Sequence, residues 1–130
     1  MDQDHCSPQK KIKMDRRKIG NIGEAKAKLF FIERGYDIFI PETVNPPFDF
    51  VVYKDGDCKK VEVKSSFKKD WSMKLMTCYT TVKKHVAVHF NAQSDYLVLY
   101  HGKTGILKVV ESKTLEGRNC VSIKTVESIL

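Results

Sequence analysis

Residues 48–65 read FDFVVYKDGDCKKVEVKS, and this stretch decides the fold of the chain. The apolar run 48–53 predicts a strand that contains a single charge, Asp49. The sequence Asp55-Gly56-Asp57 is typical of a tight hairpin turn. Residues 59–65 then alternate between apolar and charged side chains, which predicts a second strand with one face of each kind. We therefore expect two antiparallel strands joined by a short turn.

One helix is expected before this hairpin, and several strands are expected after it. Residues 17–35 predict the helix, and Gly35 fits the position where it stops. The apolar residues that recur there at helical spacing are Ile22, Ala25, Leu29 and Ile32. Further strands are predicted at 38–40, 85–90, 96–100, 106–110 and around 120–123. Residues 66–81 suggest an irregular loop with one strand, and the chain should end in a short helix or tail. A helix followed by strands indicates an α/β or α+β fold with a mixed central sheet.

The length of 130 residues suits one domain, and a hydrophobic share of 42% permits a real core. Residues 1–16 are expected to form a mobile basic arm, and residues 17–130 a single domain. The sequence contains neither an apolar run of membrane-spanning length nor a signal-peptide core, so we expect an intracellular, cytoplasmic protein. The cysteines lack a CxxC pair, which favours reduced thiols over disulfides or zinc ligands: Cys6, Cys58, Cys78 and Cys120.

Positive charge is concentrated in two stretches of the chain, whose formal net charge is +7. Residues 59–84 contain eight lysines and only two acids, and residues 10–18 form a second basic cluster. Such stretches are either solvated faces or surfaces that contact nucleic acid. The candidate DNA-binding residues are Lys18, Lys68, Lys69, Lys74, Lys83 and Lys84.

Asp49, Glu62 and Lys64 form the constellation that is able to carry chemistry. Glu62 and Lys64 share the charged face of one strand, about 7 Å apart, and the hairpin makes Asp49 a cross-strand or diagonal neighbour of Glu62. Two crowded carboxylates repel each other unless a cation lies between them. Mg²⁺ prefers such oxygen ligands, and Mn²⁺ is the expected substitute. Lys64 adds a positive charge that could hold a phosphate or polarise a water molecule.

Four segments in this order resemble the PD-(D/E)-X-K nucleases: Gly20-Asn21-Ile22-Gly23-Glu24, Gly35-Tyr36, Phe48-Asp49-Phe50 and Val61-Glu62-Val63-Lys64. The resemblance covers about residues 18–65 and implies a restriction-endonuclease-like core, with helices flanking the sheet. It also implies that Asp49, Glu62 and the backbone carbonyl of Val63 bind metal, and that Lys64 is the catalytic lysine. Glu24 would complete the site from the helix, through a water molecule or directly. The family's proline-aspartate pair is interrupted here, as Pro47-Phe48-Asp49.

More narrowly, the segments resemble two small groups of nucleases, and this likeness implies the substrate and partners. One group is the homing endonucleases associated with group I introns in bacteria and phages, which implies site-specific cleavage of double-stranded DNA by a protein encoded by a phage or mobile element. The other is the archaeal Holliday-junction resolvases, which cut four-way junctions. A third reading is a basic nucleic-acid-binding module whose acids are structural. Either enzyme would need a homodimer or a higher homo-oligomer to reach both strands.

Other motifs carry less chemistry. His85 and His89 are four residues apart, but a strand would separate their rings by about 13 Å, too far for one zinc ion. The segment from Gly20 to Gly23 lacks the lysine of a phosphate loop, and the Ser65–Ser66 pair has no adjacent base. Trp71 and Tyr79 lie among lysines, where they could stack on bases or act as partly buried anchors.

Overall fold

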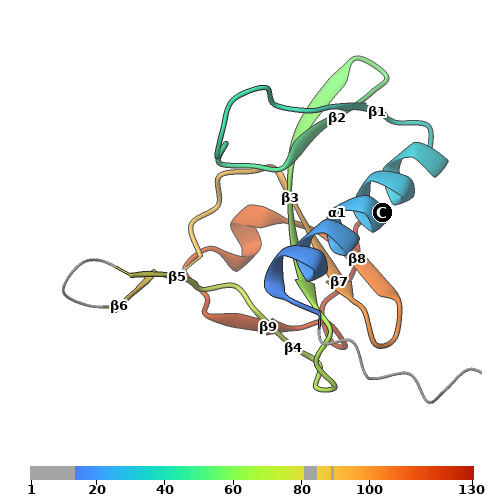
Figure 1. Ribbon diagram of the computed structural model, residues 1–130. Helices are drawn as coiled ribbons and strands as arrows, with labels where there is room; N and C mark the ends of the chain where they lie inside the picture. Colours follow the sequence, from blue (N-terminus) through green and yellow to red (C-terminus); the bar gives the residue numbers. More distant parts are fainter. Residues whose placement is uncertain (1–13, 81–84, 89) are drawn as a thin grey trace, which may run out of the picture.

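A five-stranded sheet forms the centre of the computed structural model, which describes residues 14–80, 85–88 and 90–130 (Figure 1). In chain order, the elements are α1 (Arg16–Glu33), β1 (Asp37–Phe39), β2 (Phe50–Lys54), β3 (Asp57–Ser66), β4 (Ser72–Lys74), β5 (Thr77–Thr80), β6 (His85–Val88), β7 (Tyr96–His101), β8 (Ile106–Glu111), the 3₁₀ helix η1 (Ser112–Leu115) and β9 (Cys120–Ser122). The sheet order is β1-β2-β3-β7-β8, with β3 and β7 parallel and the other neighbours antiparallel. The predicted fold class, α+β with a mixed central sheet, is confirmed.

The hairpin of β2 and β3 has the tight turn that its sequence predicts. Lys54 pairs with Asp57, so Asp55 and Gly56 alone form the loop, with φ angles of 53° and 80°. Positive φ at both loop positions is the geometry of a type I′ turn, whose twist matches that of the two strands. This turn fixes the register, which pairs Phe50 with Val61. Every residue of β3 therefore has a defined partner in β2 or a defined position beyond its end.

Helix α1 begins one residue earlier than predicted and ends at Glu33, two residues before the predicted stop at Gly35. Asp15 caps its start, because its Oδ1 accepts a hydrogen bond of 2.9 Å from the backbone N–H of Lys18. Gly35 follows its end with a φ of 86°, a conformation that favours glycine. The proposed arm lies almost entirely in residues 1–13, outside the described part of the chain.

The buried face of α1 differs from the stripe that the sequence predicted. Leu29 and Ile32 from that stripe are 50% and 55% exposed. The buried residues are Gly23, Ala27 and Phe31. Phe31 is selected because its ring meets the rings of Phe50, Tyr36 and Tyr96, and the small residues let the helix backbone approach the sheet. The helix is therefore rotated relative to the prediction, and this rotation turns Glu24 toward the sheet.

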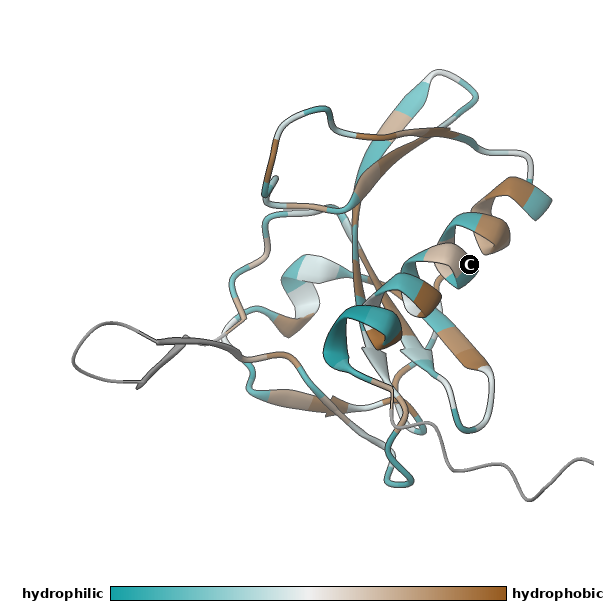
Figure 2. Ribbon diagram, in the orientation of Figure 1, coloured by the Kyte–Doolittle hydropathy of each residue, from teal (hydrophilic) through white to brown (hydrophobic). Residues whose placement is uncertain are grey.

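The two faces of the sheet bury two separate hydrophobic cores. The first lies under α1 and includes Val61, Val98 and Val109. The second contains Leu97 and Leu99, which alternate with Val98 along β7 and face the other way. Figure 2 shows apolar residues recurring between hydrophilic ones along α1.

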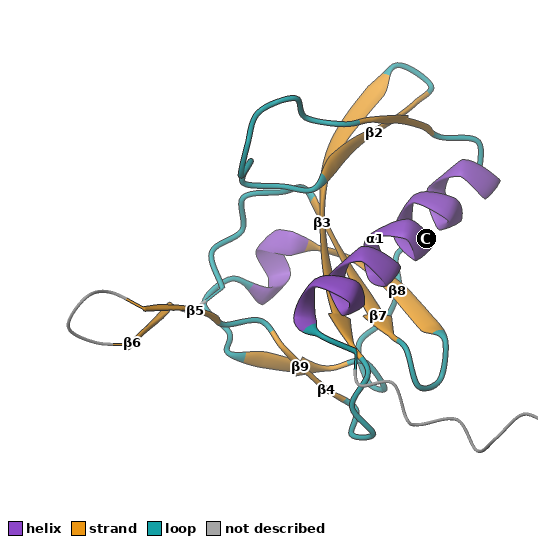
Figure 3. Ribbon diagram, viewed as in Figure 1, coloured by secondary structure: helices purple, strands orange, loops and turns teal. Residues whose placement is uncertain are grey.

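A second flanking helix was expected, but no second α-helix lies in the described residues; the other helical ribbon in Figure 3 is the 3₁₀ helix η1. The second face is covered instead by β4, β9 and η1, which contribute Met73, Val121 and Leu115. Short strands and a 3₁₀ turn bury enough apolar side chains to replace the helix. This covering is irregular, so it leaves little periodic signal in the sequence.

The later segments follow the predictions with local differences. Residues 66–81 contain two short strands, β4 and β5, where one was expected, and β6 ends at Val88. The chain ends as a tail, held where the backbone N–H of Ile129 donates to the carbonyl of Val109 over 2.8 Å. Within the described ranges, no helix has both the length and the apolar character needed to cross a membrane.

Candidate active site

Asp49 comes directly before the first residue of β2, at the edge where β3 continues beyond its partner strand. Its backbone N–H donates over 2.8 Å to the carbonyl of Val61, the residue that pairs with Phe50, so Asp49 stays bonded to β3 next to Glu62. Its Oδ2 accepts a hydrogen bond of 2.7 Å from the backbone N–H of Val63. The carboxylate therefore accepts the hydrogen bond that a backbone carbonyl would accept if the strand pairing continued. The hairpin brings the two predicted metal-binding acids together.

Glu62 and Lys64 project from the face of β3 opposite to α1, because Val61 and Val63 between and beside them pack toward the helix. The Nζ of Lys64 lies 3.4 Å from the Oε2 of Glu62, and their side chains are 24% and 20% exposed. This is the arrangement expected from the Glu-Val-Lys alternation. A half-buried lysine thus accompanies the half-buried acids.

Both acids hold their protons more tightly than usual. The pKa of Asp49 is raised mainly by burial and further by the charge of Glu24, against the lowering effects of the Val63 N–H, Lys64 and Lys28. The pKa of Glu62 is also raised mainly by burial and further by the charge of Asp49, whereas Lys64 lowers it. Ionisation of the two acids is therefore unfavourable in the metal-free site, and a bound cation would favour it.

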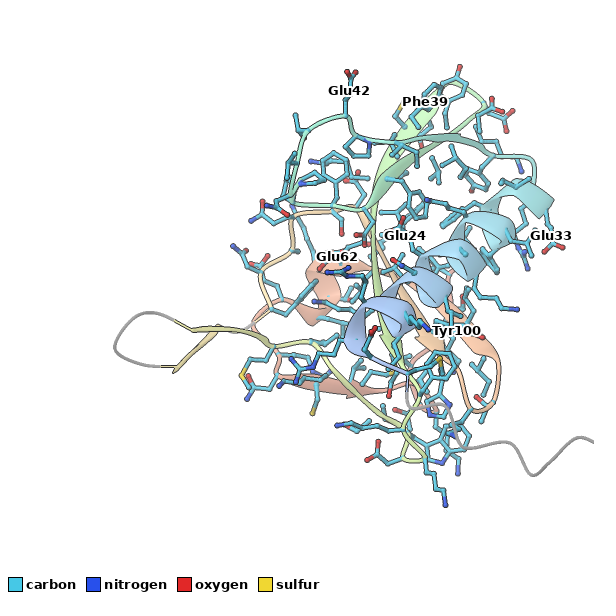
Figure 4. All side chains as sticks on the ribbon, in the orientation of Figure 1. Glu24, Glu33, Phe39, Glu42, Glu62 and Tyr100 are labelled. Carbon is cyan, nitrogen blue, oxygen red and sulfur yellow. The ribbon has the colours of Figure 1, made fainter. Side chains whose placement is uncertain are left out.

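Glu24 approaches Asp49 from α1, which covers the face of β3 opposite to Glu62 and Lys64. Figure 4 labels Glu24 and Glu62 in the same part of the molecule, where the helix passes over β3, and Glu33 at the far end of the helix. The Oε2 of Glu24 lies 2.8 Å from the Nζ of Lys28, four residues later on the helix. Lys28 was not among the sequence candidates, although the i,i+4 spacing from an acid is a recognisable signal.

The backbone of α1 lies against β3 directly below Glu24. A Cβ atom at Gly23 would lie 1.6 Å from the Oγ of Ser65 and 2.8 Å from its Cβ, so any side chain there would force Ser65 or the helix to move. The Oγ of Ser65 is buried and has no hydrogen-bond partner among the described residues. This close approach is a second feature that the sequence candidates missed. It sets the distance between the helix carboxylate and the strand carboxylates.

The donor set fits a hard divalent cation. Asp49 and Glu62 supply carboxylate oxygens, and the period of two places the carbonyl of Val63 on the same side of β3 as its N–H, which faces Asp49. In the described ranges, no group of three or more His, Cys, Asp or Glu side chains is arranged to hold a metal. Glu24 therefore stands outside the immediate donor set, in contact with Lys28. Mg²⁺ usually keeps several waters and needs only one or two protein carboxylates.

The predicted DNA-binding lysines are spread over several elements. Lys18 is exposed in the first turn of α1, Lys68 and Lys69 are exposed in the loop after β3, and Lys74 is exposed in β4. Lys83 and Lys84 lie outside the described residues. These four lysines are thus exposed to solvent, and none of them lies in β2 or β3.

Trp71 and His101 make contacts that stabilise the fold. Trp71 is half-buried and stacks on the imidazole of His101, with ring centroids 5.1 Å apart, which agrees with the anchor reading. The fully buried His101 joins its Nε2 to the carbonyl of Asp70 and its Nδ1 to the hydroxyl of Thr104, each over 2.8 Å. These contacts fix the start of the segment that leaves β3.

One comparison with known proteins gives the family of the chain, and a second gives its fold. Residues 14–127 match the sequence profile of a family described as PD-(D/E)XK endonuclease. The chain is similar in structure to a bacterial homing endonuclease, I-Ssp6803I, with a TM-score of 0.72 and 17% sequence identity, over 89% of this chain and 81% of that one. No curated protein sequence matches the chain.

Proposed function

Because the chain belongs to the PD-(D/E)XK endonuclease family, we propose that it is a Mg²⁺-dependent, site-specific homing endonuclease that hydrolyses phosphodiester bonds of double-stranded DNA. The observation that carries the proposal is the pair Asp49 and Glu62, which the hairpin brings close together beside the start of β2, half-buried and with raised pKa values. Crowded, half-buried carboxylates are unfavourable for folding and favourable for a cation. Their position is therefore explained best by a ligand.

In this proposal Asp49, Glu62 and the carbonyl of Val63 hold the metal ion. Once bound, such an ion lowers the pKa of water and stabilises negative charge that develops on the phosphate. Asp49 stays oriented by the N–H of Val63, so its second oxygen is free of that bond. Lys64 has a flexible stem and lies 3.4 Å from Glu62, so its ammonium group can contact a phosphate beside the acids. Glu24 aids from the helix, through a water molecule.

The homing assignment rests on the Gly-Asn-Ile-Gly-Glu and Gly-Tyr segments and on the fold shared with a homing endonuclease. The proposed substrate contacts are Lys18, Lys68, Lys69, Lys74, Lys83 and Lys84. A single chain of 130 residues covers little DNA, so we propose a homodimer or larger homo-oligomer that presents two sites to two strands. Such a protein would act in the cytoplasm.

The test compares the protein with its Glu62→Ala variant on intact duplex and on four-way junctions, with and without Mg²⁺. We expect Mg²⁺-dependent scission of duplex DNA that the variant loses. Scission of junctions alone would instead identify a Holliday-junction resolvase. Binding of both substrates without scission would identify a non-catalytic nucleic-acid-binding domain.

Lys64→Ala separates metal binding from turnover. We expect this variant to keep its affinity for metal, since no ligand oxygen is removed, and to lose most of its turnover. Calorimetry with Mg²⁺ and a single-turnover cleavage assay measure the two quantities. A collapse of metal affinity in this variant would contradict the role proposed for Lys64.

A further inference from the structure

Lys28 reaches the active site from the helix. Its Nζ lies 2.8 Å from the Oε2 of Glu24 and 5.8 Å from the ring centroid of Phe50, the residue that follows Asp49. Its positive charge also acts on Asp49, whose pKa it lowers against the stronger effect of burial. Lys28 thus lies within the electrostatic field of the carboxylate cluster, although it belongs to a different element.

The two lysines and three acids of the site are arranged as ion pairs with one acid left over. Lys64 pairs with Glu62 at 3.4 Å, and Lys28 pairs with Glu24 at 2.8 Å, which leaves Asp49 bonded to the backbone. Three carboxylates and two ammonium groups give a formal charge of −1. A divalent cation changes this charge to +1, which one phosphodiester of −1 balances.

Without Lys28, the formal charge of the metal-bound site would be different. A site with three carboxylates, one lysine and one divalent cation is neutral before DNA arrives. The phosphodiester would then enter without a compensating charge. The second lysine is therefore what makes the metal-bound site attractive to a phosphate.

Lys28 is also able to change partners. Its side chain is 31% exposed, so the ammonium group stands at the rim of the site and can move in solvent. Its Nζ lies over the ring of the fully buried Phe50, at the edge of the carboxylate cluster. A flexible stem with a compact charge suits a group that releases one anion and binds another.

We propose that Lys28 is a second phosphate-binding lysine of this site, which neutralises Glu24 in the metal-free protein and contacts the phosphate of DNA when a divalent cation neutralises the carboxylates. The inference rests on the proposed nuclease function. Lys64 pairs with an acid of β3, whereas Lys28 pairs with an acid of α1. The proposal also gives the Glu24–Lys28 pair a role beyond helix stability, since exposed i,i+4 pairs contribute only a few tenths of a kcal/mol.

The test uses Lys28→Gln in the full-length chain, with Lys26→Gln as the matched control. Lys26 is exposed on the same helix, and its substitution removes the same charge. We expect Lys28→Gln to bind Mg²⁺ or Mn²⁺ about threefold to tenfold more tightly, because one repelling charge is gone. We also expect its single-turnover cleavage to fall about 10- to 100-fold, because a phosphate contact is lost. Lys26→Gln should change neither quantity.

Opposite changes in metal affinity and cleavage cannot arise from a loss of folding alone. Lys28→Arg keeps the charge and should restore the affinity of the original protein for metal, with partial recovery of cleavage. Equal behaviour of Lys28→Gln and Lys26→Gln would overturn the role of Lys28, while the original protein still cleaved. Absence of metal-dependent cleavage in the original protein would overturn the nuclease function itself, and the inference with it.

Discussion

Substitution of Gly23 by alanine should misplace the helix carboxylate with little unfolding. The new Cβ would lie 1.6 Å from the Oγ of Ser65, and rotation of that hydroxyl can relieve this contact because no hydrogen bond holds it. The Cβ of Ser65 stays 2.8 Å away and must move to at least 3.4 Å for an ordinary contact. The helix therefore shifts by about half an ångström or more, and Glu24 moves with it.

We expect this shift to lower cleavage more than stability. Overpacking costs about 1–3 kcal/mol, and the better helix propensity of alanine returns about 1 kcal/mol. The net loss in the free energy of unfolding should be near 1 kcal/mol. A displacement approaching 1 Å in a catalytic group lowers rates by up to about 100-fold. Urea denaturation and single-turnover cleavage of duplex DNA measure the two effects.

Gly20→Ala is the matched control, since nothing lies within 4 Å of a Cβ at Gly20 on the same helix. It should stabilise the protein by about 0.5–1 kcal/mol and leave cleavage unchanged. Adding Ser65→Gly to Gly23→Ala removes the clashing atoms, so that Val63 Cγ1 at 3.6 Å becomes the nearest neighbour. The double variant should recover cleavage relative to Gly23→Ala. Full activity of Gly23→Ala alone would refute the reasoning.

Three further predictions concern Asp49, His101 and the lysines that follow β3. Asp49→Asn should abolish cleavage and raise the Tm at pH 8. A carboxyl with a raised pKa destabilises the fold as pH rises through that pKa, so the gain in Tm should vanish toward pH 3; a gain that does not depend on pH would contradict the prediction. His101→Leu should lower stability by about 1–3 kcal/mol in denaturant titration, because the carbonyl of Asp70 loses its donor; unchanged stability would show that water replaces it. The double variant Lys68→Ala and Lys69→Ala should reduce the slope of log affinity for DNA against log salt by about 2, and an unchanged slope would place both lysines away from DNA.

Local sequence predicted the hairpin and its acids well. The Asp55-Gly56 turn has one favoured geometry, and the alternation of Val61 and Val63 with charged residues fixes which side chains face the core. The closeness of Asp49 to Glu62 then follows from the pairing of β2 with β3. These features depend on residues close in sequence, which is why the pattern contains them.

The packing of α1 could not be predicted in the same way. Two apolar stripes compete on this helix, and the sheet selects the one with Phe31 because aromatic partners are present there. Gly23 gave no periodic signal, since its role depends on Ser65, more than forty residues later. The contact between Lys28 and the site depends on that same docking. Contacts between residues far apart in the sequence therefore determined how α1 packs on the sheet.

The type I′ turn of the hairpin has a consequence for the order in which the chain folds. Hairpins with short turns form within about 1–10 μs, so Asp49 and Glu62 should meet early. Pairing of β3 with β7 joins Val61 to Tyr96 and must wait for closure of the long intervening segment. Docking of α1, which delivers Glu24 and Lys28, depends on the core that this pairing completes. A partly folded chain would thus possess the metal-binding acids without the helix groups, and the ability to cut DNA would arise only in the finished protein.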